Sequence, residues 1–135
     1  MTNSHTARAL LGACLIATAA LHAAPARAAA SDYRFEVVEV KSAGTGKSDV
    51  SLRLIHTPDN KPVTDAVLFQ VKADMGPDGM PTMTAPAKAL PAAKAGLYTV
   101  EIGPGMAGNW SLQVAAKVQG GSETVRAALP LKLGK

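Results

Sequence analysis

The sequence predicts an all-β fold, an immunoglobulin-like antiparallel β-sandwich of six to seven strands after an N-terminal signal peptide. Three observations support this class. Apolar and polar residues alternate in short runs, turn residues recur about every 8–12 positions, and no helical pattern follows residue 30. Because alternation with period two buries one face of a strand, such strands need a second sheet to cover that face. We therefore expect one domain, residues 31–135, built from two packed sheets.

The first half of this domain contains three expected strands, separated by two turns rich in Gly, Pro, Asp and Asn. Those residue types either allow or fix the backbone angles of a turn, or bond to the local backbone. In the third strand, alternation places Phe69 on the side that faces the core. The strands cover residues 33–41, 50–54 and 67–71, and the turns cover residues 42–47 and 57–62.

The second half contains three further alternating runs. Trp110 begins the longest of them and is the largest expected piece of the core, together with Tyr98. Leu90 anchors a short edge strand in the Ala/Pro/Lys segment that precedes these runs. Pro130 marks the last strand as an edge or bulged strand, because proline cannot donate to a ladder. The runs cover residues 98–102, 110–118 and 125–133, and Gly120-Gly121 supplies a hairpin turn.

Residues 1–30 have the pattern of a secretory signal peptide. The apolar run is shorter than the roughly 20 residues that a spanning helix needs, so we expect cleavage and a periplasmic protein. The alternative is an uncleaved segment that anchors the chain to the inner membrane. The parts of the pattern are a basic start at 1–8, an apolar run at 9–24, and two small-x-small motifs, Ala26-Arg27-Ala28 and Ala28-Ala29-Ala30.

Cleavage near residue 30 changes the chemistry that the working protein can use. It removes the single cysteine, Cys14, and leaves His56 as the one histidine. Disulfides, thiolate metal sites and a cysteine nucleophile are therefore excluded. It also removes Arg8 and Arg27, so twelve basic residues remain against ten acidic ones, a net charge of about +2.

The remaining composition argues against nucleic-acid binding and against catalysis. No basic cluster is present to follow a phosphate backbone, and few aromatic residues are available for base stacking. An enzyme needs a nucleophile with a base, paired carboxylates or a metal with an open position. Asp74 and Asp78 bracket Gly76-Pro77 and are interpreted as turn formers. We expect a protein that is not an enzyme and has no catalytic or organic-cofactor site.

The segment Asp74–Met83 is the most unusual part of the chain. Three of the five methionines, Met75, Met80 and Met83, lie within nine residues. The segment is too rich in Gly and Pro for a helix or a central strand, so we expect a loop. Methionine usually fills gaps in a core, and an exposed loop has few such gaps. These thioethers are therefore interpreted as exposed soft ligands, as a sticky surface, or as part of a lid.

Binding of a soft metal is the chemistry that this composition favours. Thioethers and imidazole, without thiolates, suit copper(I) outside the cytoplasm. A second Gly/Pro loop contains Met106, and this loop can face the first one because loops at one end of a sandwich cluster. The candidate metal ligands are Met75, Met80, Met83, Met106 and His56.

Each of these candidates also has a structural explanation. The loop methionines can form an adaptable hydrophobic cap or a surface for a partner. Met106 can close the end of the core over Trp110. His56 lies two residues after Leu54, so strand alternation places both side chains on the same face. His56 is then at the rim of the buried face, where it can be a hydrogen-bonded residue or a turn cap.

Several motifs follow one another in a recognisable order along residues 50–118. Asp59-Asn60-Lys61-Pro62-Val63 precedes the methionine loop, and Gly96-Leu97-Tyr98 and then Met106-Ala107-Gly108-Asn109-Trp110 follow it. In this order the chain resembles the YtkA-like or FixH-like domain family. Members of that family resemble one another in a D-G-K-P-V turn, a Met-rich loop, G-x-Y and M-x-G-x-W. Here Asn60 replaces the usual Gly of the turn, and the loop lacks the histidines of other members.

The resemblance implies an exported immunoglobulin-like β-sandwich linked to copper handling or to the assembly of respiratory oxidases. It implies copper as the bound metal and a copper-handling or oxidase-assembly protein as the partner. We therefore expect a small periplasmic protein that binds or traffics a soft metal, copper(I), through its Met-rich loop. The alternative is a non-catalytic interaction module that docks on a membrane or periplasmic partner through the same loop. The positions that the resemblance marks as ligands are Met75, Met80, Met83 and Met106.

Overall fold

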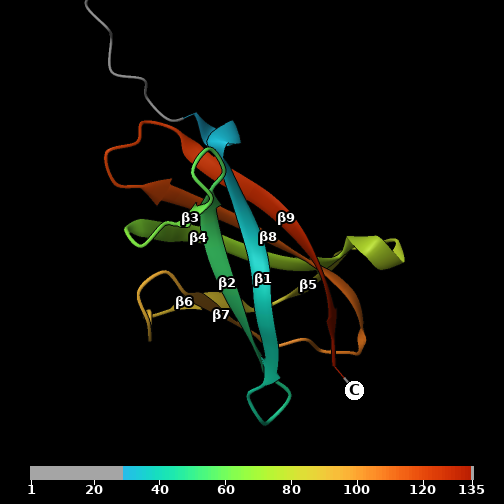
Figure 1. Ribbon diagram of the computed structural model, residues 1–135. Coiled ribbons are helices and arrows are strands. Elements are labelled where there is room, and N and C mark those ends of the chain that lie inside the picture. Colours follow the sequence, from blue (N-terminus) through green and yellow to red (C-terminus); the bar gives the residue numbers. More distant parts are fainter. Residues whose placement is uncertain (1–28, 135) are drawn as a thin grey trace, which may run out of the picture.

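The computed structural model describes residues 29–134. The expected signal peptide therefore lies almost wholly outside the described residues. The described chain folds into two antiparallel sheets that pack face to face, with β1 and β2 lying across β4 and β8 (Figure 1). This arrangement confirms the all-β sandwich that the alternating runs predict. None of the helices within residues 29–134 is long and apolar enough to cross a bilayer.

Within the described residues the chain forms nine strands and two short 3-10 helices. One sheet has the strand order β1-β2-β7-β6, with β3 paired to β2, and the other has the order β5-β4-β8-β9. In chain order the elements are η1 (Ala30–Asp32), β1 (Tyr33–Ser42), β2 (Ser48–His56), β3 (Lys61–Pro62), β4 (Ala66–Met75), η2 (Gly76–Asp78), β5 (Met80–Ala85), β6 (Ala87–Leu90), β7 (Tyr98–Ile102), β8 (Gly108–Val118) and β9 (Thr124–Leu133).

The expected count of six to seven strands is too low, because the two-residue strand β3 lies in the expected turn at residues 57–62 and because the segment Asp74–Met83 is mostly strand. β4 continues through Met75, β5 begins at Met80, and only the η2 turn separates them. Proline is tolerated here because β5 is the edge strand of its sheet. Gly79 closes the turn with φ of 75°, a left-handed angle that favours glycine. The methionine segment is therefore a hairpin, which we call the methionine hairpin (residues 74–84).

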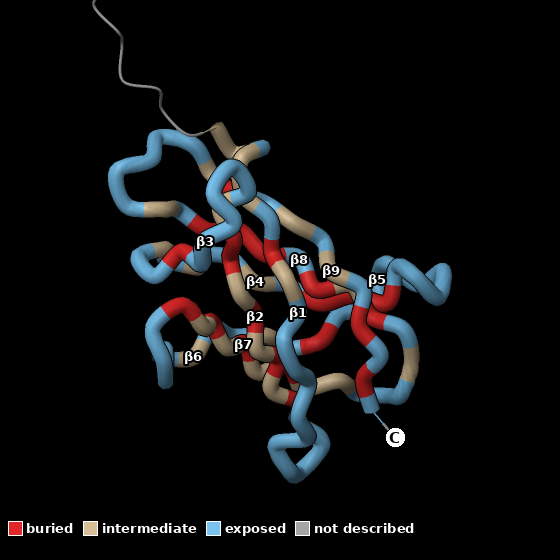
Figure 2. The backbone as a smooth tube through the Cα atoms, viewed as in Figure 1, coloured by how far each residue is buried: buried red, intermediate tan, exposed pale blue. Residues whose placement is uncertain are grey.

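The core lies between the two sheets and is built from the inward residues of both (Figure 2). Trp110 is 2% exposed and Tyr98 is also buried, as the sequence predicts. Burial of each such large apolar side chain contributes about 1.5–3 kcal/mol to stability. Pro130 lies on β9 and Leu90 on β6, both edge strands, which confirms the two edge assignments.

Phe69 is the main error in the expected core. Its side chain is 53% exposed, although strict alternation places it inside. In β4, Leu68 pairs with Ala116 and Gln70 pairs with Ala115, so Phe69 has no partner and forms a bulge. A bulge adds one residue and reverses the parity of the strand after it. Leu68 and Val71 consequently both pack against the core, while Phe69 faces solvent.

The Tyr98 hydroxyl fixes the segment in which the chain passes from one sheet to the other. It donates to the Val63 carbonyl at 2.8 Å and accepts from the Ala66 backbone N–H at 3.1 Å. Burial raises the pKa of this phenol above its ordinary value of 10.0. The hydroxyl therefore stays neutral and satisfies two backbone groups that lie beside the core.

We predict that Tyr98→Phe lowers the free energy of unfolding by about 1–3 kcal/mol, because it leaves a buried carbonyl and a backbone N–H unpaired. Urea denaturation followed by Trp110 fluorescence measures the loss. Tyr33→Phe is the matched control, since among the described residues no hydrogen bond involves the Tyr33 hydroxyl. Equal stability of the two variants would contradict a role for the Tyr98 hydroxyl.

Candidate metal centre

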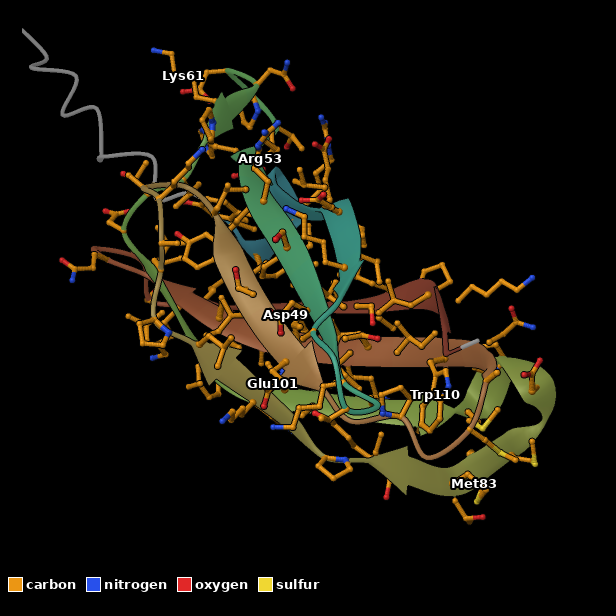
Figure 3. All side chains as sticks on the ribbon, turned by 90° about the horizontal axis from the view of Figure 1, so that it is seen from below. Asp49, Arg53, Lys61, Met83, Glu101 and Trp110 are labelled. Atoms are coloured by element: carbon orange, nitrogen blue, oxygen red, sulfur yellow. The ribbon has the colours of Figure 1, made fainter. Side chains whose placement is uncertain are left out.

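The four candidate methionines lie at one end of the sandwich. Met75 and Met80 face each other as a pair across the methionine hairpin, and Met83 follows in β5. Met106 lies in the loop between β7 and β8. Every sulfur atom drawn in Figure 3 lies at this end, near the labelled Met83 and Trp110. The structure therefore brings together the two Met-containing segments that the sequence suggests as neighbours.

The four thioethers differ sharply in access to solvent. Met80, Met83 and Met106 are 38%, 41% and 45% exposed, whereas Met75 is 2% exposed. The ladder of the hairpin is interrupted after Met80, because Met75 pairs with Met80 while the preceding residue, Asp74, pairs with Thr84. Residues 81–83 are thus extra residues on β5 and bulge from the sheet edge. This bulge carries Met83.

Met75 belongs to the core rather than to the exposed set. A β-carbon added to Gly108 would lie 2.5 Å from the Met75 terminal methyl carbon and 2.8 Å from Oδ2 of Asp78. Glycine at position 108 therefore leaves room for these two side-chain ends, which a larger residue would displace. The expectation that the whole segment is a loop without packing use is therefore wrong for Met75, which fills the end of the core.

A pair of hydrogen bonds ties the methionine hairpin to the start of β8, directly after the loop that contains Met106. The Asn109 backbone N–H donates to Oδ2 of Asp78 at 2.7 Å, and the Asn109 side-chain amide donates to Oδ1 at 2.8 Å. The pKa of Asp78 is lowered from its ordinary value of 3.8, first by the side-chain amide and then by the backbone N–H of Asn109. We call this contact the Asp78–Asn109 pair.

Asp74 anchors the other end of the same hairpin. Its carboxylate is buried and accepts hydrogen bonds from the Gly76 N–H at 3.0 Å and from the Gln113 amide at 2.7 Å. The first bond shapes the turn, and the second joins the hairpin to β8. Both aspartates thus use their carboxylates to hold the hairpin, which agrees with their interpretation as turn formers. The sequence does not predict the hydrogen bonds from these aspartates to β8, because spacing along the chain does not show which distant residues meet.

The backbone of Met106 is held by Trp110, the largest residue of the core. The Trp110 indole N–H donates to the Met106 carbonyl at 3.3 Å, and Trp110 itself is buried. The backbone of Met106 is therefore held while its side chain stays exposed. A groove of about 520 Å³ lies beside it, between the β1–β2 turn and the β7–β8 loop, and its lining includes Lys47, Pro104, Met106 and Lys132.

His56 does not join the methionines. It lies at the far end of β2 and bonds to Oδ1 of Asp59 at 2.8 Å, with its ring 5.2 Å from that of Tyr33. Val118 lines the same surface hollow, whereas the opposite end of β8 begins at the methionine hairpin. β8 has 11 residues and so spans about 35 Å at roughly 3.3 Å per residue. One metal ion cannot contact both His56 and the methionines.

The part of the chain that the structure describes contains no second candidate metal site built from carboxylate, imidazole or thiolate ligands. No group of three or more His, Cys, Asp or Glu residues there is arranged to hold a metal ion. The carboxylates nearest the methionines, Asp74 and Asp78, are already engaged in hydrogen bonds. The candidate centre therefore consists of the exposed thioethers of Met80, Met83 and Met106, with Met75 behind them.

Limited oxidation of the folded protein tests this difference in access. We predict that dilute hydrogen peroxide converts Met80, Met83 and Met106 to sulfoxides well before Met75, because the oxidant must reach the sulfur. Mass spectrometry of the peptides gives the rate at each position. In urea the four rates should become similar. Equal rates for Met75 and Met83 in the folded protein would contradict the buried position of Met75.

Acid titration tests the Asp78–Asn109 pair. Because the folded pKa of Asp78 is lowered, its stabilising contact is complete above pH 3.8 and is lost as pH falls through the lowered pKa. We predict that the Asn109 amide resonances stay constant from neutral pH down to about pH 4 and shift only below it. Asp78→Asn should abolish this transition. A midpoint at or above 3.8 in the unsubstituted protein would contradict the pair.

The comparisons with known proteins give one match. The family model described as YtkA-like matches residues 27–115, about two thirds of the chain. No curated protein and no solved structure matches the chain. The matched range includes the methionine hairpin, the Met106 loop and most of β8. The resemblance seen in the sequence motifs is thereby confirmed, and the chain belongs to the YtkA-like family.

Proposed function

We propose that this protein binds copper(I), or passes it on, through the exposed thioethers of Met80, Met83 and Met106. The observation that carries the proposal is their placement, since two separate segments present them at one end of a rigid sandwich. Thioethers are soft ligands and select copper(I) over harder ions. The protein acts outside the cytoplasm after export, without catalysis and without nucleic acid.

The structure around the thioethers supports a centre that is held before metal arrives. The Asp78–Asn109 pair joins the hairpin to the start of β8, which follows the Met106 loop, and Trp110 of the same strand holds the Met106 backbone. Side chains presented by strands and braced loops need less ordering on binding than side chains on free loops. Exposure of the three sulfurs also lets an ion enter and leave, which suits transfer to a partner that handles copper or assembles an oxidase.

Titration with copper(I) against a competing chelator tests the proposal. We predict that replacing Met80, Met83 and Met106 together with Leu weakens binding at least tenfold, the loss that follows from removing roughly 1.4 kcal/mol or more of binding energy. Leu keeps the size and apolar character of Met and removes the sulfur. Trp110, the only tryptophan, supplies a second measurement, because an ion bound beside Met106 should change its fluorescence.

His56→Ala is the matched control for this titration. It removes the other candidate ligand at the opposite end of the sandwich and should leave the affinity unchanged. If His56→Ala weakens copper(I) binding as much as the triple Leu variant does, the ion binds elsewhere. If the unsubstituted protein and the triple Leu variant bind copper(I) equally poorly, the proposal is wrong.

A docking surface is the second candidate function. It is favoured by the same three apolar side chains, exposed beside the groove that Met106 lines. Met→Leu substitutions keep an apolar surface, whereas Met→Ser substitutions remove it. If partner capture survives the Leu variant, fails with the Ser variant and needs no metal, the end of the sandwich serves as a docking surface. Loss of capture with the Leu variant supports a role for the sulfurs.

A further inference from the structure

The two sheets differ in how charged side chains are arranged on them. On and around the β1-β2-β7-β6 sheet, basic and acidic side chains form ion pairs, such as Lys41 with Glu39 at 3.0 Å and Lys47 with Glu101 at 3.0 Å. Among the described residues, none of the ion pairs includes a residue of β4, β5, β8 or β9. The first sheet therefore neutralises much of its charge in pairs, whereas the second sheet carries its basic side chains outside such pairs.

Three of these basic side chains point away from the core. Each follows a residue that packs in the core, and successive side chains of a strand alternate between its two faces. Lys72 lies in β4, Lys117 in β8 and Arg126 in β9, and all three are exposed. We call the surface formed by these three residues, together with Val67 and Phe69, the basic face.

Acidic side chains of the same strands do not offset this charge. Four basic residues lie in β4, β5, β8 and β9, namely Lys72, Lys117, Arg126 and Lys132. The one acidic residue of these strands, Asp74, is 4% exposed, and its carboxylate already accepts two hydrogen bonds. In the flanking segments, Asp65 precedes β4, and Glu123 accepts a hydrogen bond from the Ala30 N–H. The basic face therefore suits a negatively charged partner.

Two apolar side chains project from the same surface. Phe69 is 53% exposed at the bulge of β4, and Val67 is 57% exposed and pairs with Lys117. Leu68, which lies between them, packs against the core, so both of its neighbours point to the outer side of the sheet. The basic face thus combines positive charge with protruding apolar groups.

A hollow of about 350 Å³ lies beside Arg126 on this face. Its lining includes the small residue Ala115, which pairs with Gln70 on one side and with Arg126 on the other. The Arg126 guanidinium donates to Oε1 of Gln70 at 3.3 Å. This bond uses one of the five N–H donors of the guanidinium, and the planar group can bind phosphate oxygens with the others.

We propose that the basic face binds the surface of a bilayer that contains anionic phospholipids. The lysine and arginine side chains are attracted to the headgroup phosphates. Phe69 and Val67 enter the boundary between the headgroups and the acyl chains, where apolar side chains of peripheral proteins are buried.

The geometry favours a bilayer over an acidic protein as the partner. The three cations lie on three different strands and do not converge on one point, which matches a plane that presents phosphates everywhere. A bilayer also admits a protruding ring without a matching pocket. The proposal is independent of copper binding, because Val67 and Lys117 lie at the end of β8 opposite to the methionine hairpin. The two proposals can therefore fail separately.

Sedimentation with lipid vesicles tests this proposal. The full chain is mixed with vesicles of phosphatidylcholine, with or without phosphatidylglycerol. Replacing Lys72, Lys117 and Arg126 together with Gln should weaken binding to the anionic vesicles at least about tenfold, since each cation near such a surface contributes about fivefold. Residues 1–28 are the same in every variant, so their own affinity for lipid cancels in this ratio.

A triple substitution on the other sheet is the matched control. Replacing Arg34, Lys41 and Lys88 together with Gln removes the same net charge, but each of these residues is paired with a carboxylate. This variant should keep most of the affinity for anionic vesicles. Equal weakening by the two triple variants would show that only net charge matters and would overturn the proposal. Binding of the unsubstituted protein that does not increase with phosphatidylglycerol would overturn it as well.

The apolar part of the basic face has its own test. Phe69→Ser should weaken binding to anionic vesicles about fivefold or more, because the ring no longer leaves water. Val38→Ser, at a 46% exposed position on β1, is the matched control and should leave binding unchanged. Unchanged urea midpoints show that both variants remain folded. If Phe69→Ser has no effect and polyglutamate binds the basic face more tightly than the vesicles do, the partner is an acidic polypeptide and the bilayer proposal is wrong.

Discussion

Burial of two inner sheet faces against each other is the interaction on which the rest of the molecule depends. Residues 29–134 contain no cysteine, so no disulfide joins the sheets. The largest fully buried side chains come from both sheets, with Leu52 and Leu54 on one side and Trp110 and Leu112 on the other. Trp110 belongs to this core and also holds the Met106 carbonyl. The candidate metal centre is thus braced by the same packing that stabilises the fold.

Most of the fold could be predicted because burial of one strand face leaves a period of two in the sequence. This period assigns Trp110 and Tyr98 to the core, while Pro130 and the short run around Leu90 identify β9 and β6 as edge strands. The meeting of the methionine hairpin with the Met106 loop could also be anticipated, since loops at one end of a sandwich gather. These features follow from local pattern and from the class of fold.

Features that depend on which strands pair, and in which register, could not be predicted from the sequence. A single bulge in β4 exposes Phe69, and nothing in the alternation marks an extra residue before the partner strand is known. Met75 is core because β8 begins at Gly108 directly against it. The separation of His56 from the methionines depends on how the two sheets stack. The Asp78–Asn109 pair joins residues 31 apart in the chain, and only the folded register brings them together.

The path of the chain between β5 and β6 has a consequence for association. β5 is the edge of one sheet and β6 the edge of the other, and Pro86 alone lies between them. The two open edges on this side of the sandwich are therefore one continuous segment, with Pro81 before Pro86 and Pro91 after it. Because proline lacks the N–H that an added strand needs, this segment is a poor template for a second chain. A surface that presents methionines can thus remain exposed without drawing copies of the protein into shared sheets.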